Sequence, residues 1–170
     1  MKIDRWLLAA VLLLPVPAAA QWEGWDYVFD QEKKPWRELQ AQIPPYPKPE
    51  SLIEFEAGAA SPHRFYIDSK SISVGSDGAV RYTLVIRAAG GATNVSFEGM
   101  RCDTREQKYY ATGRSDGSWD RSRNPRWRPI ENPEVNHYHA VLYADFFCKD
   151  KVLVKSAAEA VERLKYGGDG

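Results

Sequence analysis

Apolar and polar residues alternate along the middle of the chain, and this alternation predicts an antiparallel β-sheet. The clearest strand is AVRYTLVIRAA at 79–89, where every second side chain from Val80 to Ile86 is apolar, as expected for a strand with one buried face. Asp77-Gly78 before it and Gly90-Gly91 after it favour tight turns between antiparallel strands. Similar patterns predict the remaining strands at 52–57, 64–68, 70–74, 93–103 and 107–113.

The apolar residues change faces within the strand predicted at 93–103. Val95 and Phe97 share one parity, whereas Met100 and Cys102 share the other. A β-bulge at Gly99 would return the later residues to the core face, because one extra residue shifts the alternation by one position. We therefore expect a bulge at Gly99.

A helical period replaces the alternation towards the C-terminus. Asn132-Pro133 places a capping side chain before a proline, which is favoured at the first helical position. The pattern predicts an amphipathic helix over 133–147. Its inward stripe recurs at spacings of four, three and four residues through Val135, His139, Leu142 and Phe146.

Two shorter signals follow this helix. KVLV at 151–154 predicts a short strand. Ser156 and Glu159, within SAAE, form a capping box that begins a second helix, which we expect to end at Gly167. The patterns together predict an α+β fold, an antiparallel β-sheet with the C-terminal helices packed on it.

The segment before the sheet has a different composition. Residues 21–50 begin with aromatic and acidic side chains and end with IPPYPKPE, four prolines in eight residues, which favours an extended strap on a surface. A short helix beginning near Pro35 is the one regular element that we expect there. We therefore divide the chain into a signal peptide at 1–20, a strap at 21–50 and a single α+β domain at 51–170.

The first twenty residues have the composition of a cleavable export signal. Lys2 and Arg5 are basic, WLLAAVLLL is apolar, and Ala18 and Ala20 provide the small residues before the cleavage site. The apolar run is far shorter than the ~20 residues that cross a bilayer, so we expect no transmembrane anchor after cleavage. The signal predicts export but does not select the final address, so secretion or outer-membrane association remain alternatives to the periplasm.

Cys102 and Cys148 both lie in the part of the chain that would be exported. Two cysteines in an oxidising compartment most simply form one disulfide, which contributes about 4 kcal/mol in the chain-entropy model. We expect a structural disulfide, because the sequence has no C-x-x-C motif to lower a thiol pKa.

The charges balance overall but are unevenly distributed. Lys and Arg number 23, and so do Asp and Glu, which argues against general nucleic-acid binding. Residues 21–60 hold eight acids and four bases, a net charge of −4, whereas 101–128 hold eight bases and four acids, a net charge of +4. Such asymmetry bears on partners and on docking within the molecule.

RSRNPRWRP at 121–129 is the strongest binding candidate. Arginine presents a planar set of donors suited to phosphate, sulfate or carboxylate groups, and tryptophan stacks on sugars or on arginine. The loop would therefore bind an envelope protein or an anionic envelope component. The favoured alternative is a loop anchored by its tryptophans, with arginines that are solvated or paired with the acidic N-terminal segment. The candidate residues are Trp119, Arg121, Arg123, Arg126, Trp127 and Arg128.

Groups suited to metal binding or catalysis are few. His137 and His139 would diverge on the predicted helix, so we expect no metal and no other cofactor. A G-x-S-x-G match at Gly113–Gly117 falls in the turn predicted at SDGSW and not between a strand and a helix, and the sequence has no phosphate-binding glycine loop, so we assign no catalytic residue. An enzyme acting on envelope material would have to bring at least two of His63, Glu98 and His139 into one cleft.

Several segments carry a family resemblance: KPWREL, YPKPESLIEF, YIDSKSISVGSDGAVRYTLVI, NVSFEGMRCDTREQKYYATGRSDGSWDRSRNPRWRPI and HAVLYADFFC. In this order they resemble the CNP-like ("cryptic neisserial protein") family of small exported proteins, from about Trp36 to Cys148. The resemblance implies a periplasmic protein of Gram-negative bacteria and supplies no catalytic residue. We therefore expect a non-enzymatic interaction or envelope-support module, with a hydrolase acting on the cell envelope or a protein binding an anionic glycan or lipid as alternatives.

The export signal makes a direct prediction about the mature protein. We expect cleavage after Ala20, so that the exported chain begins at Gln21. The intact mass of protein purified from the periplasm checks this, and an exported chain that retains Met1 would contradict it.

Overall fold

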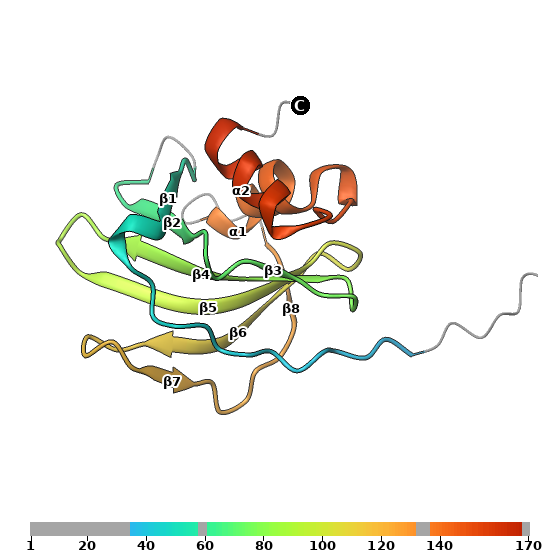
Figure 1. Cartoon of the computed structure of the whole chain (residues 1–170), viewed down its shortest axis with the longest axis horizontal. Helices are drawn as coiled ribbons and strands as arrows, with labels where there is room; N and C mark the ends of the chain where they lie inside the picture. The colour runs from blue at the N-terminus through green and yellow to red at the C-terminus, as the bar shows by residue number, and fades with distance from the viewer. Residues whose placement is uncertain (1–34, 58–60, 132–136, 168–170) are drawn as a thin grey trace, which may run out of the picture. The chain divides into compact units, whose positions relative to one another are not determined.

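Residues 35–57, 61–131 and 137–167 are described by the structure, a computed structural model, and they contain one antiparallel sheet of eight strands (Figure 1). The main path runs β1–β2–β4–β5–β6–β7, while β3 pairs with β4 and β8 with β6. The predicted antiparallel sheet is confirmed. The strands are β1 Leu52–Phe55, β2 Arg64–Asp68, β3 Ser73–Val74, β4 Ala79–Arg87, β5 Thr93–Arg101, β6 Glu106–Gly113, β7 Trp119–Arg121 and β8 Arg128–Pro129.

Glycines allow the tight turns at both ends of β4. Gly78 has φ +77° and Gly91 has φ +87°, a region of backbone conformation that other residues adopt at a cost. These turns pair β3 with β4 and β4 with β5. The segment 70–74 is less regular than predicted, because only its last two residues, Ser73–Val74, pair as a strand.

The central strands bury both of their faces. Tyr82 and Met100 belong to the main core under the C-terminal helices, whereas Val85 and Val95 pack with Tyr46 of the strap on the other side. The predicted bulge at Gly99 is therefore wrong: β4 and β5 pair without a shift through that position. The apolar residues of β5 change parity because both faces of the strand are covered, and the earlier and later ones pack on opposite faces. The strand itself does not rotate.

A register shift does occur, one strand further along the sheet. Phe97 pairs with Ala111 and Glu98 with Tyr109, so Tyr110 of β6 has no partner residue in β5. The hydroxyl of Tyr109 lies 3.0 Å from that of Tyr138 in the helical layer, whereas the hydroxyl of Tyr110 contacts the strap. Two adjacent tyrosines therefore serve opposite faces of the sheet.

The first predicted helix is present from Tyr138 onwards. α1 spans Tyr138–Val141 and continues into a π-helical turn, η2, at Leu142–Phe147, while the predicted start at 132–136 lies outside the described residues. The wider π turn places Phe147 fully in the core and leaves Phe146, on the predicted stripe, only partly buried.

The segment after this helix differs from the prediction. KVLV at 151–154 forms no strand; a 3₁₀ turn, η3 at Lys149–Lys151, leads into extended chain. The helix α2 at Ala157–Tyr166 is confirmed, with the Ser156 hydroxyl accepting from the Glu159 N–H and Gly167 at its C-terminal end. Figure 1 shows these helices together on one side of the sheet. Among the residues that the structure describes, no helix has the length and apolar character needed to cross a membrane.

The predicted disulfide between Cys102 and Cys148 is confirmed. It joins the residue after β5 to the residue after η2. The Tyr143 hydroxyl donates to the Cys102 carbonyl at 3.0 Å and reinforces this link. The helical layer is thus tied covalently to the central sheet.

The strap covers the second face of the sheet. Its described part is extended from Trp36 to Lys48 and ends in a 3₁₀ turn, η1 at Pro49–Ser51, so the helix expected near Pro35 is absent from this range. Trp36 donates its indole N–H to the Asp77 carbonyl at 2.6 Å. The Leu39 N–H donates to the Asp77 carboxylate, and the Leu39 carbonyl accepts from Arg81.

Glu38 is the charged anchor of the strap. Its carboxylate accepts from the Lys108 ammonium at 2.6 Å, the Tyr110 hydroxyl at 2.7 Å and the Trp127 indole at 3.3 Å. Burial alone would raise the pKa of Glu38, but these donors outweigh burial and lower it. The carboxylate is therefore bound as an anion.

We predict that Glu38→Gln lowers the free energy of unfolding by about 1–2 kcal/mol at pH 7, because the charge-assisted bonds are lost. A pKa that is lowered on folding stabilises the protein above the ordinary value of 4.5 and loses this effect as the pH falls through the folded-state value. The difference between wild type and variant should therefore shrink below about pH 4.5 in urea unfolding curves.

Glu50→Gln is the matched control, because Glu50 is an exposed acid of the same strap. It should change the free energy of unfolding by less than about 0.5 kcal/mol. Equal effects of the two substitutions would show that Glu38 does not anchor the strap.

Candidate functional site

The arginine-rich segment lies between β7 and β8 at the edge of the sheet, and its two tryptophans hold it in place. Trp119 donates its indole N–H to the Pro44 carbonyl at 3.0 Å and packs on Tyr46. Trp127 meets Trp36 edge to face, with ring centroids 5.9 Å apart. Both tryptophans are half-buried, so they act as the anchors of the loop on the strap.

The four arginines of this segment have a different environment. Each is exposed, and none forms an ion pair with an acid among the residues that the structure describes. The strap acid Glu38 is bound by Lys108 instead. We call this set the loop arginines: Arg121, Arg123, Arg126 and Arg128.

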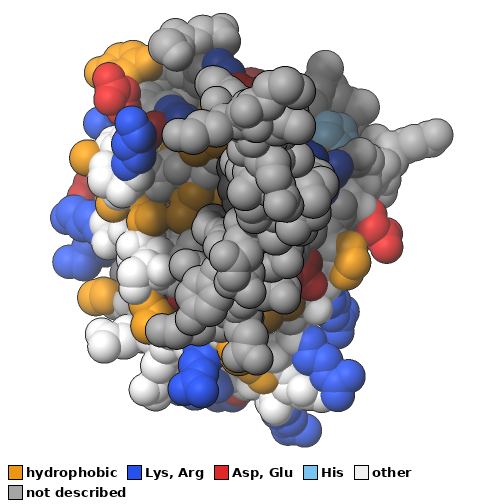
Figure 2. All heavy atoms as spheres, turned by 90° about the vertical axis from the view of Figure 1, so that its right-hand side faces the viewer, with side chains coloured by type: hydrophobic (Ala, Val, Ile, Leu, Met, Phe, Trp, Pro, Cys, Tyr) orange, Lys and Arg blue, Asp and Glu red, His pale blue; other side chains and the backbone are white. Residues whose placement is uncertain are grey.

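Local pairing explains why the positive charge of 101–128 collects on this loop. Arg101 pairs with Asp103 and Glu106, and Arg114 pairs with Asp120. Three of the four acids of the segment are thus paired with other cations, and Asp116 accepts from Ser118, so the loop arginines retain the surplus positive charge. Figure 2 shows Lys and Arg side chains gathered low on the face it presents, at the height of β7 and the following loop in Figure 1.

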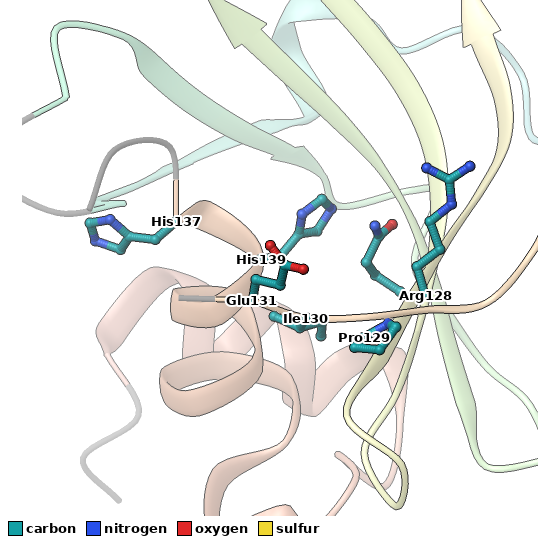
Figure 3. A pocket seen from close by; sticks show the side chains of 7 residues that line it. Arg128, Pro129, Ile130, Glu131, His137 and His139 are labelled. Atoms are coloured by element: carbon teal, nitrogen blue, oxygen red, sulfur yellow. The ribbon is translucent and has the colours of Figure 1, made fainter. Parts of the chain in front are cut away.

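Arg128 also borders a pocket of about 420 Å³ on the helical side of the sheet. Figure 3 shows its wall, in which Arg128–Glu131 approach the start of α1. His137 and His139 point in different directions there, in line with the divergence expected of them. We call this the β8 pocket, and it is lined by Gln107, Arg128, Pro129, Ile130, Glu131, His137 and His139.

A buried acid fixes one wall of the β8 pocket. Glu98 of β5 is fully buried, at 0% exposure, and its carboxylate lies 2.7 Å from Nε2 of His139. The Tyr82 hydroxyl donates to the same carboxylate at 3.3 Å, and the Ser96 hydroxyl donates at 2.5 Å. A buried carboxylate needs such donors, because its transfer from water is otherwise very costly.

Two tyrosines enclose this pair of residues. Tyr138 stacks on the His139 ring at 4.2 Å between centroids, and its hydroxyl lies 3.0 Å from that of Tyr109. Burial, with the nearby charge of Glu98 second, raises the pKa of Tyr109 to about 12 and the pKa of Tyr138 further. Both side chains therefore remain neutral phenols at physiological pH.

A second pocket, of about 380 Å³, lies on the other side of His139. We call it the β2 pocket; His63 and Phe65 line it together with Tyr138. His63 Nδ1 accepts from the Ala89 N–H at 3.3 Å. Glu98 and His139 are thus in contact, as the enzyme alternative requires, and His63 faces the same pocket as His139.

The described residues place no side-chain nucleophile against the His139 imidazole and no metal-binding cluster beside the Glu98–His139 pair. In the described part of the chain, no serine, threonine or cysteine is hydrogen-bonded to His139, so the pair has no side-chain nucleophile beside it. The described residues also contain no cluster of His, Cys, Asp and Glu able to hold a metal. The β8 pocket offers the His139 imidazole, which Glu98 orients, and the exposed guanidinium of Arg128.

The sequence identified Arg128, His139 and Glu98 as candidates, but it did not predict that they lie near one pocket. Gln107, Ile130 and Glu131 were not identified, because no local motif marks them. The pairing of Gln107 with Arg128, between β6 and β8, is what places them side by side. A strand as short as β8 has too few residues to show the alternation that predicts a strand.

Comparison with known proteins gives a family. A model of the CNP1-like family matches residues 31–165, most of the chain. Neither the curated proteins nor the solved structures contain a match. The match agrees with the resemblance carried by the sequence motifs.

We predict that Glu98→Gln lowers the free energy of unfolding by about 2–3 kcal/mol, because a buried amide replaces an acceptor of three hydrogen bonds. Chemical denaturation of the mature protein measures this loss. Glu131→Gln, at an exposed acid of the same pocket, should change it by less than about 0.5 kcal/mol. A loss below that limit for Glu98→Gln would contradict the anchoring role.

Proposed function

This chain belongs to the CNP1-like family, and from that premise we propose that it is an exported, non-enzymatic binding module of the bacterial cell envelope. Its ligand is an anionic envelope component, and the loop arginines form the binding surface. The observation that carries the proposal is four exposed guanidinium groups within 121–128 without an acidic partner in the described residues.

The rigid support of this surface favours a binding role. Trp119 and Trp127 fix both sides of the loop against the strap, and β7 and β8 pair with β6. Guanidinium groups on a fixed backbone lose less conformational freedom when they bind an anion. Their planar donors suit phosphate and carboxylate groups, which are abundant on envelope glycans and lipids.

The proposed location rests on two features of the chain. Residues 1–20 have the composition of a cleavable signal. The disulfide between Cys102 and Cys148 belongs to the kind of bond that persists in oxidising compartments. We assign the protein to the periplasm on these grounds.

A hydrolase acting on the envelope fits the site less well. The contact between Glu98 and His139 would orient an imidazole as a base. However, the carboxylate also accepts from Tyr82 and Ser96, a set of bonds that accounts for its burial without catalysis. Binding is therefore the function we adopt.

The proposal predicts salt-sensitive retention on an anionic matrix. Mature wild-type protein should elute from a heparin column at a higher salt concentration than Arg123→Gln/Arg126→Gln, because counterions compete with the matrix for exposed guanidinium groups. The salt concentration at elution is the measured quantity.

Lys155→Gln/Lys165→Gln is the matched control, since both lysines are exposed on the α2 side and the net charge changes equally. Its elution should remain close to that of the wild type. If the two double variants elute together, retention reflects net charge alone and the proposed surface is wrong.

A further inference from the structure

The β8 pocket combines a cation with one unfilled hydrogen-bond acceptor. Its volume of about 420 Å³ falls within the range of small-molecule sites. Arg128 lies at its margin, and the strand pairing of Arg128 with Gln107 sets the position of both backbones. The pocket is therefore formed by the fold before any ligand arrives.

The first requirement for a ligand, a hydroxyl group, follows from the environment of Gln107. Its Oε1 atom is buried and has no hydrogen-bond partner, a situation that costs about 1–3 kcal/mol in a folded protein. A ligand hydroxyl that reaches this end of the amide, which is covered in the free protein, would satisfy it, because a hydroxyl both donates and accepts. Glu131 lines the same pocket and offers a second acceptor for hydroxyl groups.

The charges of the pocket set the second requirement. Arg128 provides a guanidinium with no ion pair among the described residues, which matches the two oxygens of a carboxylate. Glu131, on the same wall, repels additional negative charge. The pocket therefore favours a monoanion over a dianionic phosphate monoester.

The remaining walls suit a sugar ring. Pro129 and Ile130 present apolar surface, against which the C–H face of a sugar packs. His139 uses Nε2 in its contact with Glu98, so Nδ1 is the ring nitrogen left for a ligand. Because Glu98 is fully buried, this imidazole is held in one orientation.

We infer that the β8 pocket binds a hydroxylated monocarboxylate of monosaccharide size, such as a uronic acid residue of an envelope glycan. Arg128 binds the carboxylate, and Gln107 and Glu131 bind ring hydroxyls. The inference rests on the proposed function for the source of the ligand, since a terminal sugar would reach the pocket while its anionic chain lies along the loop arginines.

Isothermal titration of the mature protein with D-glucuronate tests the inference. Glucuronate should bind, whereas D-glucose, which lacks the carboxylate, and propionate, which lacks hydroxyls, should bind at least about tenfold more weakly. Glucose 6-phosphate should also bind more weakly than glucuronate, because of Glu131. Equal binding of propionate and glucuronate, or of glucose and glucuronate, would overturn the inference.

Variants locate the binding in the β8 pocket. Arg128→Gln and Gln107→Leu should each weaken glucuronate binding by about tenfold or more, while far-UV circular dichroism verifies that each variant folds. Lys155→Gln/Lys165→Gln, at exposed lysines outside both proposed sites, should leave glucuronate binding unchanged. Undiminished binding by both pocket variants would place the ligand elsewhere.

The two proposals fail in different ways. If heparin retention depends on Arg123 and Arg126 but glucuronate does not bind, the proposed anion-binding surface stands and the assignment of the β8 pocket is wrong. If glucuronate binding depends on Arg128 and Gln107 but heparin retention does not depend on Arg123 and Arg126, the pocket assignment stands and the proposed surface is wrong.

Discussion

The central strands of this protein bury both of their faces, and the rest of the architecture follows from that constraint. β4 and β5 place Tyr82 and Met100 on one face and Val85 and Val95 on the other, so the sheet needs cover on both sides to remove apolar area from water. The C-terminal helices provide one layer and are tied to β5 through Cys102. The strap provides the other, and Glu38 fastens it to the sheet. The loop arginines lie beside the strap, and the β8 pocket lies beside the start of α1.

Local sequence signals predicted much of this fold, and they failed where the outcome depends on distant contacts. The Asp-Gly turn, the long strand at 79–89 and the capping box at Ser156 each contain their own determinants within a few residues. The bulge expected at Gly99 was wrong because parity was interpreted with one buried face in mind. A strap from 36–48 covers the second face, and no pattern within β5 reveals it. KVLV similarly has strand composition but forms no strand, and its Val154 N–H donates to the Phe147 carbonyl.

The candidate site likewise has some features that the sequence predicts and others that depend on distant contacts. Clustered arginines and tryptophans are visible in the sequence, and the structure places the tryptophans as anchors and the arginines in solvent. The contact of His139 with Glu98 joins α1 to β5, and the two residues are 41 positions apart in the sequence. The sequence therefore identified both residues as candidates but did not predict that they contact each other. Gln107 gave no signal at all, because its significance arises from one unpartnered atom beside a pocket. Such features depend on tertiary structure and become visible only with coordinates.

Two groups of cations in the described residues differ in what they contact, and this difference supports the proposed binding surface. Arg81, Arg101 and Lys108 hold the strap or its neighbours: Arg101 lies 3.9 Å from the Trp36 ring centroid, and the other two form buried or half-buried ion pairs. The loop arginines have no such role, since Trp119, Trp127 and strand pairing already fix their backbone. Like charges held close together repel one another and oppose folding. Four cations that add repulsion without supporting the fold therefore favour the proposal that an anion from outside the fold binds them.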